Sequence, residues 1–544
     1  MFVTNALLAL VILAVSRVIW EILRRFVLRS PLDNIRGPAL ASLLTGNFQQ
    51  LYSVDGWGFH NKLATEYGPI VRLTGVLGER QLYVADPKAL HNVVVKDQHV
   101  YEEHPHFISA NTILFGEGLL TTLGDHHKKQ RKLMNPVFST AHMRDMIPIF
   151  WDVVGALRST LEIQTANGPT ELDMLHWMGR TALELIGRSG LGYSFDSLTP
   201  DEPAHPYAAS VKELVPTLFR IFTLRVYVLP KVYKIGPAWL RRAVVNILPS
   251  PTLHDLRDKI DLMWKTSNEI YAQKIAALRA GDAAVKKQVG QGKDIISLLI
   301  RANMKTDDPC SEEELLGQMS TLIFAAMDTT SSALSRTVHL LATHPDVQDR
   351  LRAEIRAARK EHGARMSYDQ LETLPYLDAL CRETLRLYPP IPQLLRKTRK
   401  DVVMPFGTSV TGVNGQSLSE VFVPKGTPII ISVINANRSR EIWGEDALEW
   451  KPERWLAPLP DSVAAAHVPG IYSHLMTFLG GGRACIGFKF SQLEMKVVLV
   501  ELLDAFEFKP SQRDVQWRMS NIVSAFVKDQ PQKSQLPIVV SKAL

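Results

Sequence analysis

Cysteine is scarce in this sequence, with three residues among 544. The three are scattered, which excludes a disulfide framework and suits a reducing compartment. Linkers rich in Pro, Gly or Ser, internal repeats and low-complexity runs are also missing between residues 50 and 540. Nothing in the sequence divides this part of the chain, so we expect one large domain despite its length.

Long runs of one charge sign are missing as well. The formal net charge is +7, but no local tract of Lys and Arg accompanies it, which argues against a nucleic-acid partner. A moderate positive charge fits an acidic protein partner or an anionic membrane surface instead.

Cys485 differs from the other two cysteines in its local sequence. It follows the glycine loop 480–482 and precedes a helix-like run that continues through Phe490. A thiolate just ahead of a helix N-terminus meets free backbone N–H groups and the positive end of the helix dipole, and both lower its pKa. With no second Cys or His nearby it cannot form a zinc site, but it can be the axial ligand of a haem iron. We interpret Cys310 and Cys381 as buried free thiols.

The residues around Cys485 resemble the haem-binding signature of the cytochrome P450 family, Phe-x-x-Gly-x-Arg-x-Cys-x-Gly. The pattern is filled by Phe478, Gly481, Arg483, Cys485 and Gly487. The resemblance implies that Cys485 ligates the iron of haem b and that Arg483 binds a haem propionate. It also implies that Phe478 packs near the sulfur, while the two glycines make room.

A second pattern lies in the middle of a long predicted helix. A capping box at Ser311 begins this helix and Pro345 limits its end. Asp328 and Thr329 resemble the acid–alcohol pair of the family's oxygen-activating motif, with Ala326 where the family usually has glycine. Splitting O₂ in a mostly dry pocket requires two protons. A hydroxyl can position water and a carboxylate can relay protons, so this pair is the predicted catalytic pair.

A third pattern consists of charged residues from two segments. Glu383 and Arg386 are spaced i and i+3, so they share a helix face and can pair. Arg454 follows in the segment 452–455, which ends in Trp455 where the family has Phe. The resemblance implies a structural lock of Glu383, Arg386 and Arg454 behind the haem-binding loop.

Three more residues match positions that bind haem propionates in the family. Two carboxylates buried with a porphyrin require cationic or hydrogen-bonding partners. The family's Trp-x-x-x-Arg becomes His127 and Arg131 here, with His127 in place of Trp. Arg396, after a proline-rich turn, matches another propionate arginine.

The N-terminus is predicted to be a separate element. Residues 2–15 are almost wholly apolar, and the apolar character continues past Arg17 to residue 20, so the run reaches about 20 residues if Arg17 snorkels near its end. Arg24, Arg25 and Arg29 follow. We therefore expect residues 1–30 to be a membrane anchor with a basic flank and residues 31–544 to be the catalytic domain. The arginines place that domain in the cytosol, on a single-pass protein of the endoplasmic reticulum. A cleaved signal peptide is the alternative, but no basic residue precedes the run and no clear cleavage site follows it.

The remaining chain is predicted to be mainly α with small β-sheets (α+β), a single cytochrome P450 fold. Residues 70–74 and 81–85 read as one hairpin, and residues 421–423 and 429–431 as another. Most of the rest has a helical pattern and does not alternate as βαβ units would.

These patterns together indicate a haem-thiolate monooxygenase that inserts one atom of O₂ into a lipophilic substrate, as in fungal secondary metabolism such as terpenoid biosynthesis. The resemblance implies electrons from NADPH through a separate reductase, with cytochrome b5 as a further donor, because no dinucleotide fingerprint is present. One alternative is an O₂-independent haem-thiolate isomerase or dehydratase. Another is a non-enzymatic haem sensor or electron carrier.

The substrate pocket is predicted only by resemblance. It would draw on four mainly apolar segments, 107–115, 322–325, 391–395 and 521–523. Asn111, Thr112, Gln393 and Asn521 are the polar groups that would orient a lipophilic substrate there. A fatty acid is the second candidate, although the sequence shows no pocket arginine for its carboxylate.

Overall fold

The computed structural model of the chain describes residues 2–200 and 205–543. Helices dominate, and the described strands form four small sheets, which confirms the prediction of a mainly α fold with small β-sheets. The backbone divides into two compact units. The first contains Met1–His104, Gln393–Ala447 and Asp461–Arg483. The second contains Pro105–Pro392, Leu448–Pro460 and Ala484–Leu544.

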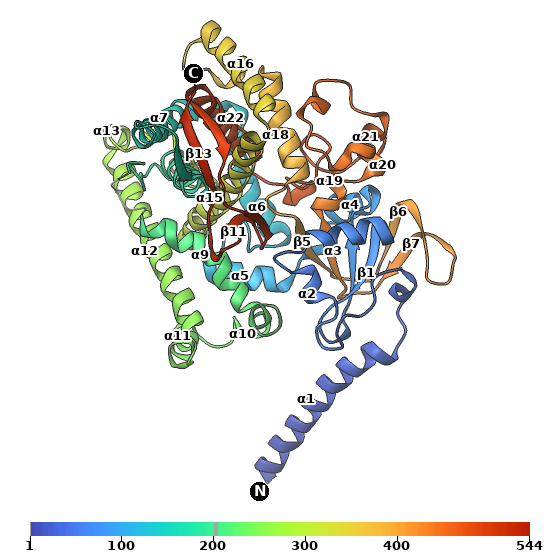
Figure 1. Cartoon of the computed structure of the whole chain (residues 1–544). Helices are drawn as coiled ribbons and strands as arrows, with labels where there is room; N and C mark the ends of the chain where they lie inside the picture. The colour runs from blue at the N-terminus through green and yellow to red at the C-terminus, as the bar shows by residue number, and fades with distance from the viewer. Residues whose placement is uncertain (1, 201–204, 544) are drawn as a thin grey trace. The chain divides into compact units, whose positions relative to one another are not determined.

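A five-stranded sheet organises the first unit (Figure 1). In spatial order its strands are β1 (Ile70–Thr74), β2 (Arg80–Val84), β8 (Pro428–Ser432), β5 (Gln393–Thr398) and β3 (Tyr101–Glu103). The first two strands form the predicted antiparallel hairpin, and β8 joins them by parallel pairing with β2. The short helices of this unit include α2 (Phe48–Leu51), α3 (Trp57–Lys62), α4 (Pro87–His91), α19 (Val433–Asn437), α20 (Arg440–Trp443) and α21 (Asp461–Ala465).

The second predicted hairpin is wrong. Its first strand belongs to β7 (Ser417–Val423), which pairs with β6 (Val402–Thr411), whereas β8 lies inside the five-stranded sheet. All five positions of β8 are buried, as expected for a strand with neighbours on both edges. The turn at 424–426 reverses the chain but does not specify the partner of either strand, which is set by burial on the two faces.

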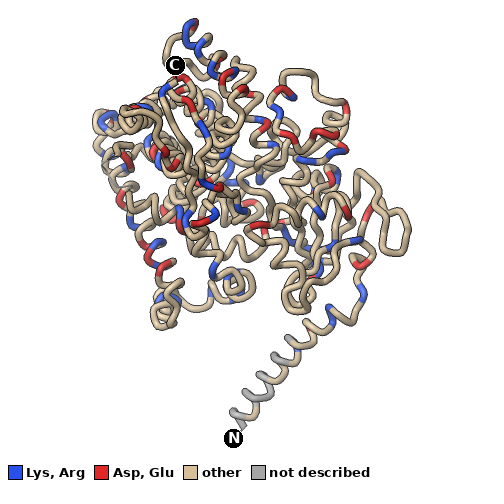
Figure 2. Tube along the Cα trace, viewed as in Figure 1, with Lys and Arg blue, Asp and Glu red and all other residues tan. Residues whose placement is uncertain are grey.

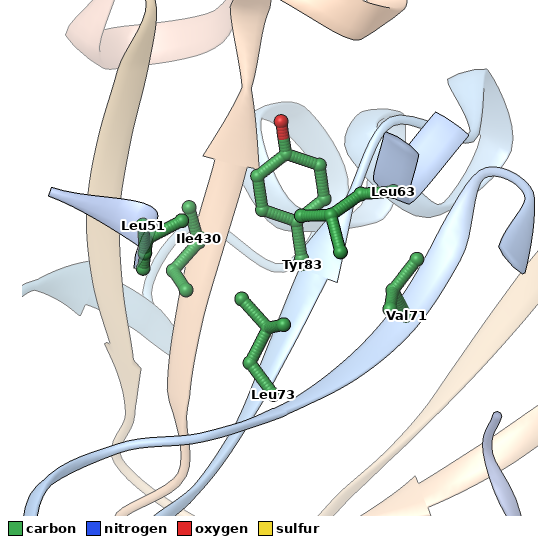
Figure 3. Close-up of a cluster of buried hydrophobic side chains, with 6 residues drawn as sticks. All are labelled: Leu51, Leu63, Val71, Leu73, Tyr83 and Ile430. Atoms are coloured by element: carbon green, nitrogen blue, oxygen red, sulfur yellow. The ribbon is translucent and has the colours of Figure 1, made fainter. Parts of the chain in front are cut away.

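A compact hydrophobic cluster packs beside this sheet (Figure 3). Its buried members are Leu51, Leu63, Val71, Leu73, Tyr83 and Ile430. The Tyr83 hydroxyl is the one polar group among the side chains of this cluster. It lies 2.8 Å from His60 Nδ1 and accepts a hydrogen bond from Ser432 Oγ at 2.6 Å. Because both contacts are made, burying this hydroxyl carries no unpaired-donor cost.

The second unit is built from helices around the long α15 (Glu312–Thr343), whose predicted capping box is present at Ser311. α15 packs against α8, α12 and α22. The unit's helices are α5 (Pro105–Phe115), α6 (Gly124–Met134), α7 (Thr140–Gln164), α8 (Met174–Leu185), α9 (Pro206–Arg220), α10 (Leu229–Val232), α11 (Ala238–Ile247), α12 (Pro251–Ala280), α13 (Asp282–Lys286), α14 (Ile295–Asn303), α16 (Pro345–His362), α17 (Tyr368–Glu372), α18 (Pro375–Leu387) and α22 (Phe488–Ala505).

Two three-stranded sheets complete the second unit. One has the order β4 (Thr170–Asp173), β13 (Pro537–Lys542) and β9 (Phe506–Pro510), and the other has β10 (Val515–Met519), β11 (Val523–Val527) and β12 (Gln530–Ser534). The chain end thereby pairs with β4, far earlier in the sequence.

The N-terminal helix α1 (Phe2–Val27) corrects the membrane prediction. Its second half carries Arg17, Glu21, Arg24 and Arg25. The charge-free run 2–16 is about 22 Å long at 1.5 Å per residue, against a hydrocarbon core of roughly 30 Å. In the described part of the chain, no helix is both long enough and apolar enough to cross a bilayer. The predicted single-pass anchor in the endoplasmic reticulum membrane is therefore wrong.

Charged residues of both signs are interspersed along the trace of each unit (Figure 2). Figure 2 thus shows no long run of one charge sign along the described backbone.

Candidate active site

Cys485 lies two residues before Gly487, the N-cap of α22. Its side chain is exposed, yet protein surrounds the thiol deeply enough that burial raises its pKa. The Gly487 N–H and the Arg131 guanidinium act in the opposite direction. The predicted net lowering is wrong, because desolvation disfavours the anion more than one N–H and one cation favour it. A metal ion bound at sulfur would reverse this balance, since coordination deprotonates a thiol.

Arg131 and His127 lie one turn apart on α6. Arg131 Nη1 donates a hydrogen bond to the carbonyl of Ala484, the residue before Cys485. Arg131 Nε donates to Asn135 Oδ1 at 3.1 Å. His127 is buried on the same helix. The structure therefore places Arg131, a predicted propionate residue, against the residue before Cys485. His127, a second predicted propionate residue, lies on the same helix as Arg131.

Arg396 and Arg483, both in the first unit, converge on one carboxylate. Arg396 Nη2 lies 3.0 Å from Glu103 Oε1, and Arg483 Nε lies 3.3 Å from Glu103 Oε2. Glu103 and Arg396 are both buried. Two guanidinium groups thus contact the same carboxylate. Sequence reasoning missed Glu103, because an acid at the end of a short strand carries no local sign of its partners.

The glycine loop before Cys485 requires glycine at position 481. Gly481 has a φ of +67°, and a Cβ there would meet the carbonyl oxygen of Val94 at 1.8 Å. The backbone passes too close to Val94 for any side chain, and a positive φ favours glycine. Phe478, at the start of the loop, packs edge-on against Tyr472 with 5.5 Å between ring centroids. The loop's shape therefore depends on the signature residues themselves.

Asp328 and Thr329 lie in an uninterrupted part of α15. Thr329 Oγ1 donates to the carbonyl of Ala325 at 2.7 Å, which leaves the hydroxyl lone pairs as acceptors. The Asp328 side chain is half-buried. Desolvation raises the pKa of its carboxyl to about 7, and the positive charge of Lys212 on α9 opposes part of that rise. An acid with a pKa near 7 both binds and releases a proton at neutral pH, as a relay must.

Glu383, Arg386 and Arg454 form a buried network. Arg386 donates from Nε and Nη2 to the two oxygens of Glu383, each at 2.8 Å, and both side chains are 0% exposed. Arg454 Nε lies 3.4 Å from Glu383 Oε1. Trp455 Nε1 donates to Glu383 Oε2 at 2.9 Å, a bond that the family's Phe could not make. The structure therefore brings together the three residues of the predicted lock and adds Trp455.

Two polar residues of α22 were missed from the sequence. Ser491 Oγ accepts a hydrogen bond from Thr330 Oγ1 on α15 at 3.4 Å. Glu494 is buried, and neither of its carboxylate oxygens has a partner in the described part of the chain. Burial raises its pKa well above the usual value. Glu494 could have been noticed in the sequence, because it is the single acidic residue in the mainly apolar run 493–500. Nothing in the local sequence distinguishes Ser491.

A family model described as Cytochrome P450 matches residues 36–535. The chain belongs to the cytochrome P450 family. It is 52% identical over 513 residues to cytochrome P450 monooxygenase 91 of Postia placenta, which covers 93% of this chain and 94% of that protein. It is 49% identical over 521 residues to monooxygenase 81 of the same fungus, with coverage of 95% and 94%.

Another similar P450 is the ganoderic acid synthetase of Ganoderma lucidum. It is 42% identical over 524 residues, and the match covers 95% of each chain. Membership at this coverage makes the chain a monooxygenase, an oxidoreductase of the P450 class. A P450 of this kind requires a haem, a small-molecule substrate, O₂ and a redox partner. The P450 prediction and the monooxygenase prediction are confirmed, and the isomerase and electron-carrier alternatives lose their support.

Proposed function

We propose that this P450 holds haem b through the Cys485 thiolate and oxidises a lipophilic secondary metabolite. The donor set supports the cofactor assignment. Cys485 is an exposed residue two positions before the N-cap of α22. When bound, the haem supplies the O–O cleavage chemistry of a thiolate-ligated iron.

The proposed propionate partners are Arg396 and Arg483 in the first unit and His127 and Arg131 in the second. An anionic cofactor requires cationic or hydrogen-bonding partners. Arg396 and Arg483 both lie at the carboxylate of Glu103, so two guanidinium groups are gathered in one place. This cluster of cationic side chains supports the proposal that these residues bind carboxylates.

The proposed roles on α15 belong to Asp328 and Thr329. Asp328 holds a proton that is exchangeable at neutral pH. The Thr329 hydroxyl, fixed by its bond to Ala325, presents its lone pairs to water. We assign proton delivery to Asp328 and the positioning of water to Thr329.

The proposed substrate is a lipophilic secondary metabolite such as a terpenoid. Phe324 on α15 is half-buried and offers apolar contact surface, and its ring packs against the buried Phe115 of α5 with 4.8 Å between centroids. Asn111, on the same helix as Phe115, is buried and is a candidate orienting group. A relative named for the synthesis of ganoderic acid supports a role in secondary metabolism.

We propose that electrons arrive from NADPH through a separate reductase, with cytochrome b5 as a second donor. Lys128 and Lys129 lie on α6, beside the proposed propionate partners His127 and Arg131. They pair with Asp125 at 2.8 Å and Asp308 at 2.5 Å, so their charge is partly neutralised.

The single observation that carries the proposed function is the position of Cys485 ahead of α22.

The test is a metabolite comparison in a host that expresses the chain together with a reductase. A host expressing Cys485→Ala with the same reductase is the control. The proposal predicts a product that carries one oxygen atom from ¹⁸O₂, appears only with the unchanged chain and requires NADPH. A product without the isotope, or one formed equally by Cys485→Ala, would overturn it.

A further inference from the structure

Glu314, in the first turn of α15, is buried and contacts a second helix as well as its own N-cap. Its Oε2 accepts a hydrogen bond from the backbone N–H of Ser311 at 2.7 Å, which is one half of the capping box. Its Oε1 accepts from Gln130 Nε2 on α6 at 2.7 Å and lies 2.7 Å from His126 Nε2 on the same helix. The capping box accounts for only one of the two oxygens, so the contacts with α6 need a separate explanation.

The two α6 side chains at Glu314 are spaced i and i+4, so they share one face of that helix. Gln130 is buried, and its Oε1 accepts a hydrogen bond from Thr122 Oγ1 at 3.0 Å, so both ends of its amide are used. Burial raises the pKa of Glu314, but its hydrogen bonds and the nearby His126 outweigh burial and hold the pKa below its usual value. The carboxylate therefore stays ionised at neutral pH, and hydrogen bonds to an ionised acceptor are stronger than those between neutral groups.

The next turn of α15 holds the segment that leads into α6. The buried Gln318 accepts a hydrogen bond at Oε1 from the backbone N–H of Leu119 at 3.0 Å. Beside it, a Cβ at Gly317 would lie 3.0 Å from the carbonyl carbon of Glu117, and a Cβ at Gly118 would lie 2.9 Å from the Gly317 oxygen. Backbone thus packs directly on backbone here. Two successive turns of α15 fix both α6 and the chain entering it.

The face of α6 next to Gln130 reaches the segment that carries Cys485. Arg131 follows Gln130 in the sequence, and successive residues of an α-helix point about 100° apart. Arg131 Nη1 donates a hydrogen bond to the carbonyl of Ala484, as described above. The helix α6 therefore joins the start of α15 to the residue before Cys485, and a displacement of α6 would disturb both contacts.

We infer that Glu314 is a positioning residue for the segment that carries the iron ligand. Its carboxylate fixes the helix α6, and Arg131 on that helix holds Ala484. The inference rests on the proposed role of Cys485 as the ligand. No bond is made or broken at Glu314, whose contribution is to set where the sulfur lies. A role limited to capping α15 would require the contact with Ser311 alone.

Hydrogen exchange of peptides that span residues 484–487 tests this link on the protein as purified. A double variant, His126→Leu with Gln130→Leu, removes both α6 contacts and keeps the capping contact of Glu314. It should accelerate this exchange by about tenfold, the scale of one or two lost hydrogen bonds. A swap of donor and acceptor, Gln130→Glu with Glu314→Gln, should restore the original rate. The new amide can donate to the new carboxylate and still accept from the backbone N–H at the cap.

Ser311→Ala is the matched control. It removes the hydroxyl that accepts from the Glu314 N–H at 3.2 Å, so it weakens the cap and leaves the contacts with α6 in place. It should lower the stability of the fold without changing the exchange at residues 484–487. Equal acceleration in Ser311→Ala and in the double variant would overturn the inference, as would a double variant that exchanges at the original rate.

The spectrum of the reduced, CO-bound protein is a second readout. In the double variant a smaller share of the haem should show the red-shifted Soret band of thiolate ligation, since a displaced sulfur binds the iron less firmly. The donor–acceptor swap should recover that share, and an unchanged share in the double variant would contradict the inference. Absence of the red-shifted band in the unchanged protein would count against the proposed function, while the exchange at residues 484–487 would still decide the role of Glu314.

Discussion

The Thr330 hydroxyl on α15 donates a hydrogen bond to the Ser491 hydroxyl on α22, with 3.4 Å between the oxygens. Thr330 directly follows the Asp328–Thr329 pair, and Ser491 lies in the first turns of the helix that Cys485 precedes. The bond thus ties the helix proposed to deliver protons to the helix that begins beside the proposed iron ligand.

Thr329→Ala should uncouple NADPH consumption from product formation. The change removes the hydroxyl but keeps a small, helix-compatible side chain, so folding and the haem spectrum should survive. Without a positioned water, proton transfer slows by up to about 10²–10⁴-fold, and reduced oxygen leaves as hydrogen peroxide. The measurement is the ratio of product to NADPH consumed. Coupling equal to that of the unchanged protein would remove Thr329 from the mechanism.

Asp328→Asn should slow turnover and flatten its pH dependence. Burial raises the Asp328 pKa to about 7, so the wild-type rate should fall as pH decreases through that value and the carboxyl becomes protonated. The amide cannot titrate, and the acid limb should disappear. The raised pKa also means that ionisation costs stability, a cost that grows as pH rises from the unfolded-state value toward 7. Asn at this position should therefore gain stability relative to the wild type above neutral pH, as measured by denaturant unfolding.

Arg386→Met should strongly destabilise the protein. It leaves the Glu383 carboxylate buried with fewer counter-charges, a change that typically costs about 3–5 kcal/mol. The control is Arg350→Met, which breaks an exposed pair with Glu453 at 2.9 Å and should cost less than about 1 kcal/mol. Denaturant unfolding measures both. Equal midpoints for the two variants would mean that the buried network does not stabilise the fold.

Glu494→Gln should stabilise the protein increasingly as pH rises. The folded-state pKa of Glu494 lies above its unfolded value, so the folded state binds more protons and wild-type stability falls as pH increases through this range. Gln has nearly the same shape and no charge. The difference in unfolding free energy between variant and wild type should grow from pH 5 to pH 8. A constant difference would show that Glu494 finds a charged partner in the folded protein.

The sequence predicted features that depend on local signals. The bounds of α15 follow from the capping box at Ser311 and from Pro345, and the geometry of the glycine loop follows from Gly481. Pairs spaced i and i+3, such as Glu383 and Arg386, meet because the helix itself fixes their positions.

Features that depend on distant partners were not predicted. The placement of β8 follows from burial on both faces, and the shared partner of Arg396 and Arg483 follows from the position of Glu103 on β3. The raised pKa values of Cys485 and Asp328 arise from surrounding protein, which no spacing rule reports. The predicted anchor extended the apolar run past Arg17, whereas the charge-free part of α1 ends at residue 16 and is too short to cross a bilayer.

The central claim is that the Cys485 thiolate ligates a haem iron, and the most direct measurement is the absorption spectrum of the reduced, CO-bound protein. The unchanged chain should show the red-shifted Soret band of a thiolate-ligated haem, and Cys485→Ala should lose it. Cys381→Ala, which changes a buried cysteine of α18, is the matched control and should keep the band. A red-shifted band that persists in Cys485→Ala would contradict the account.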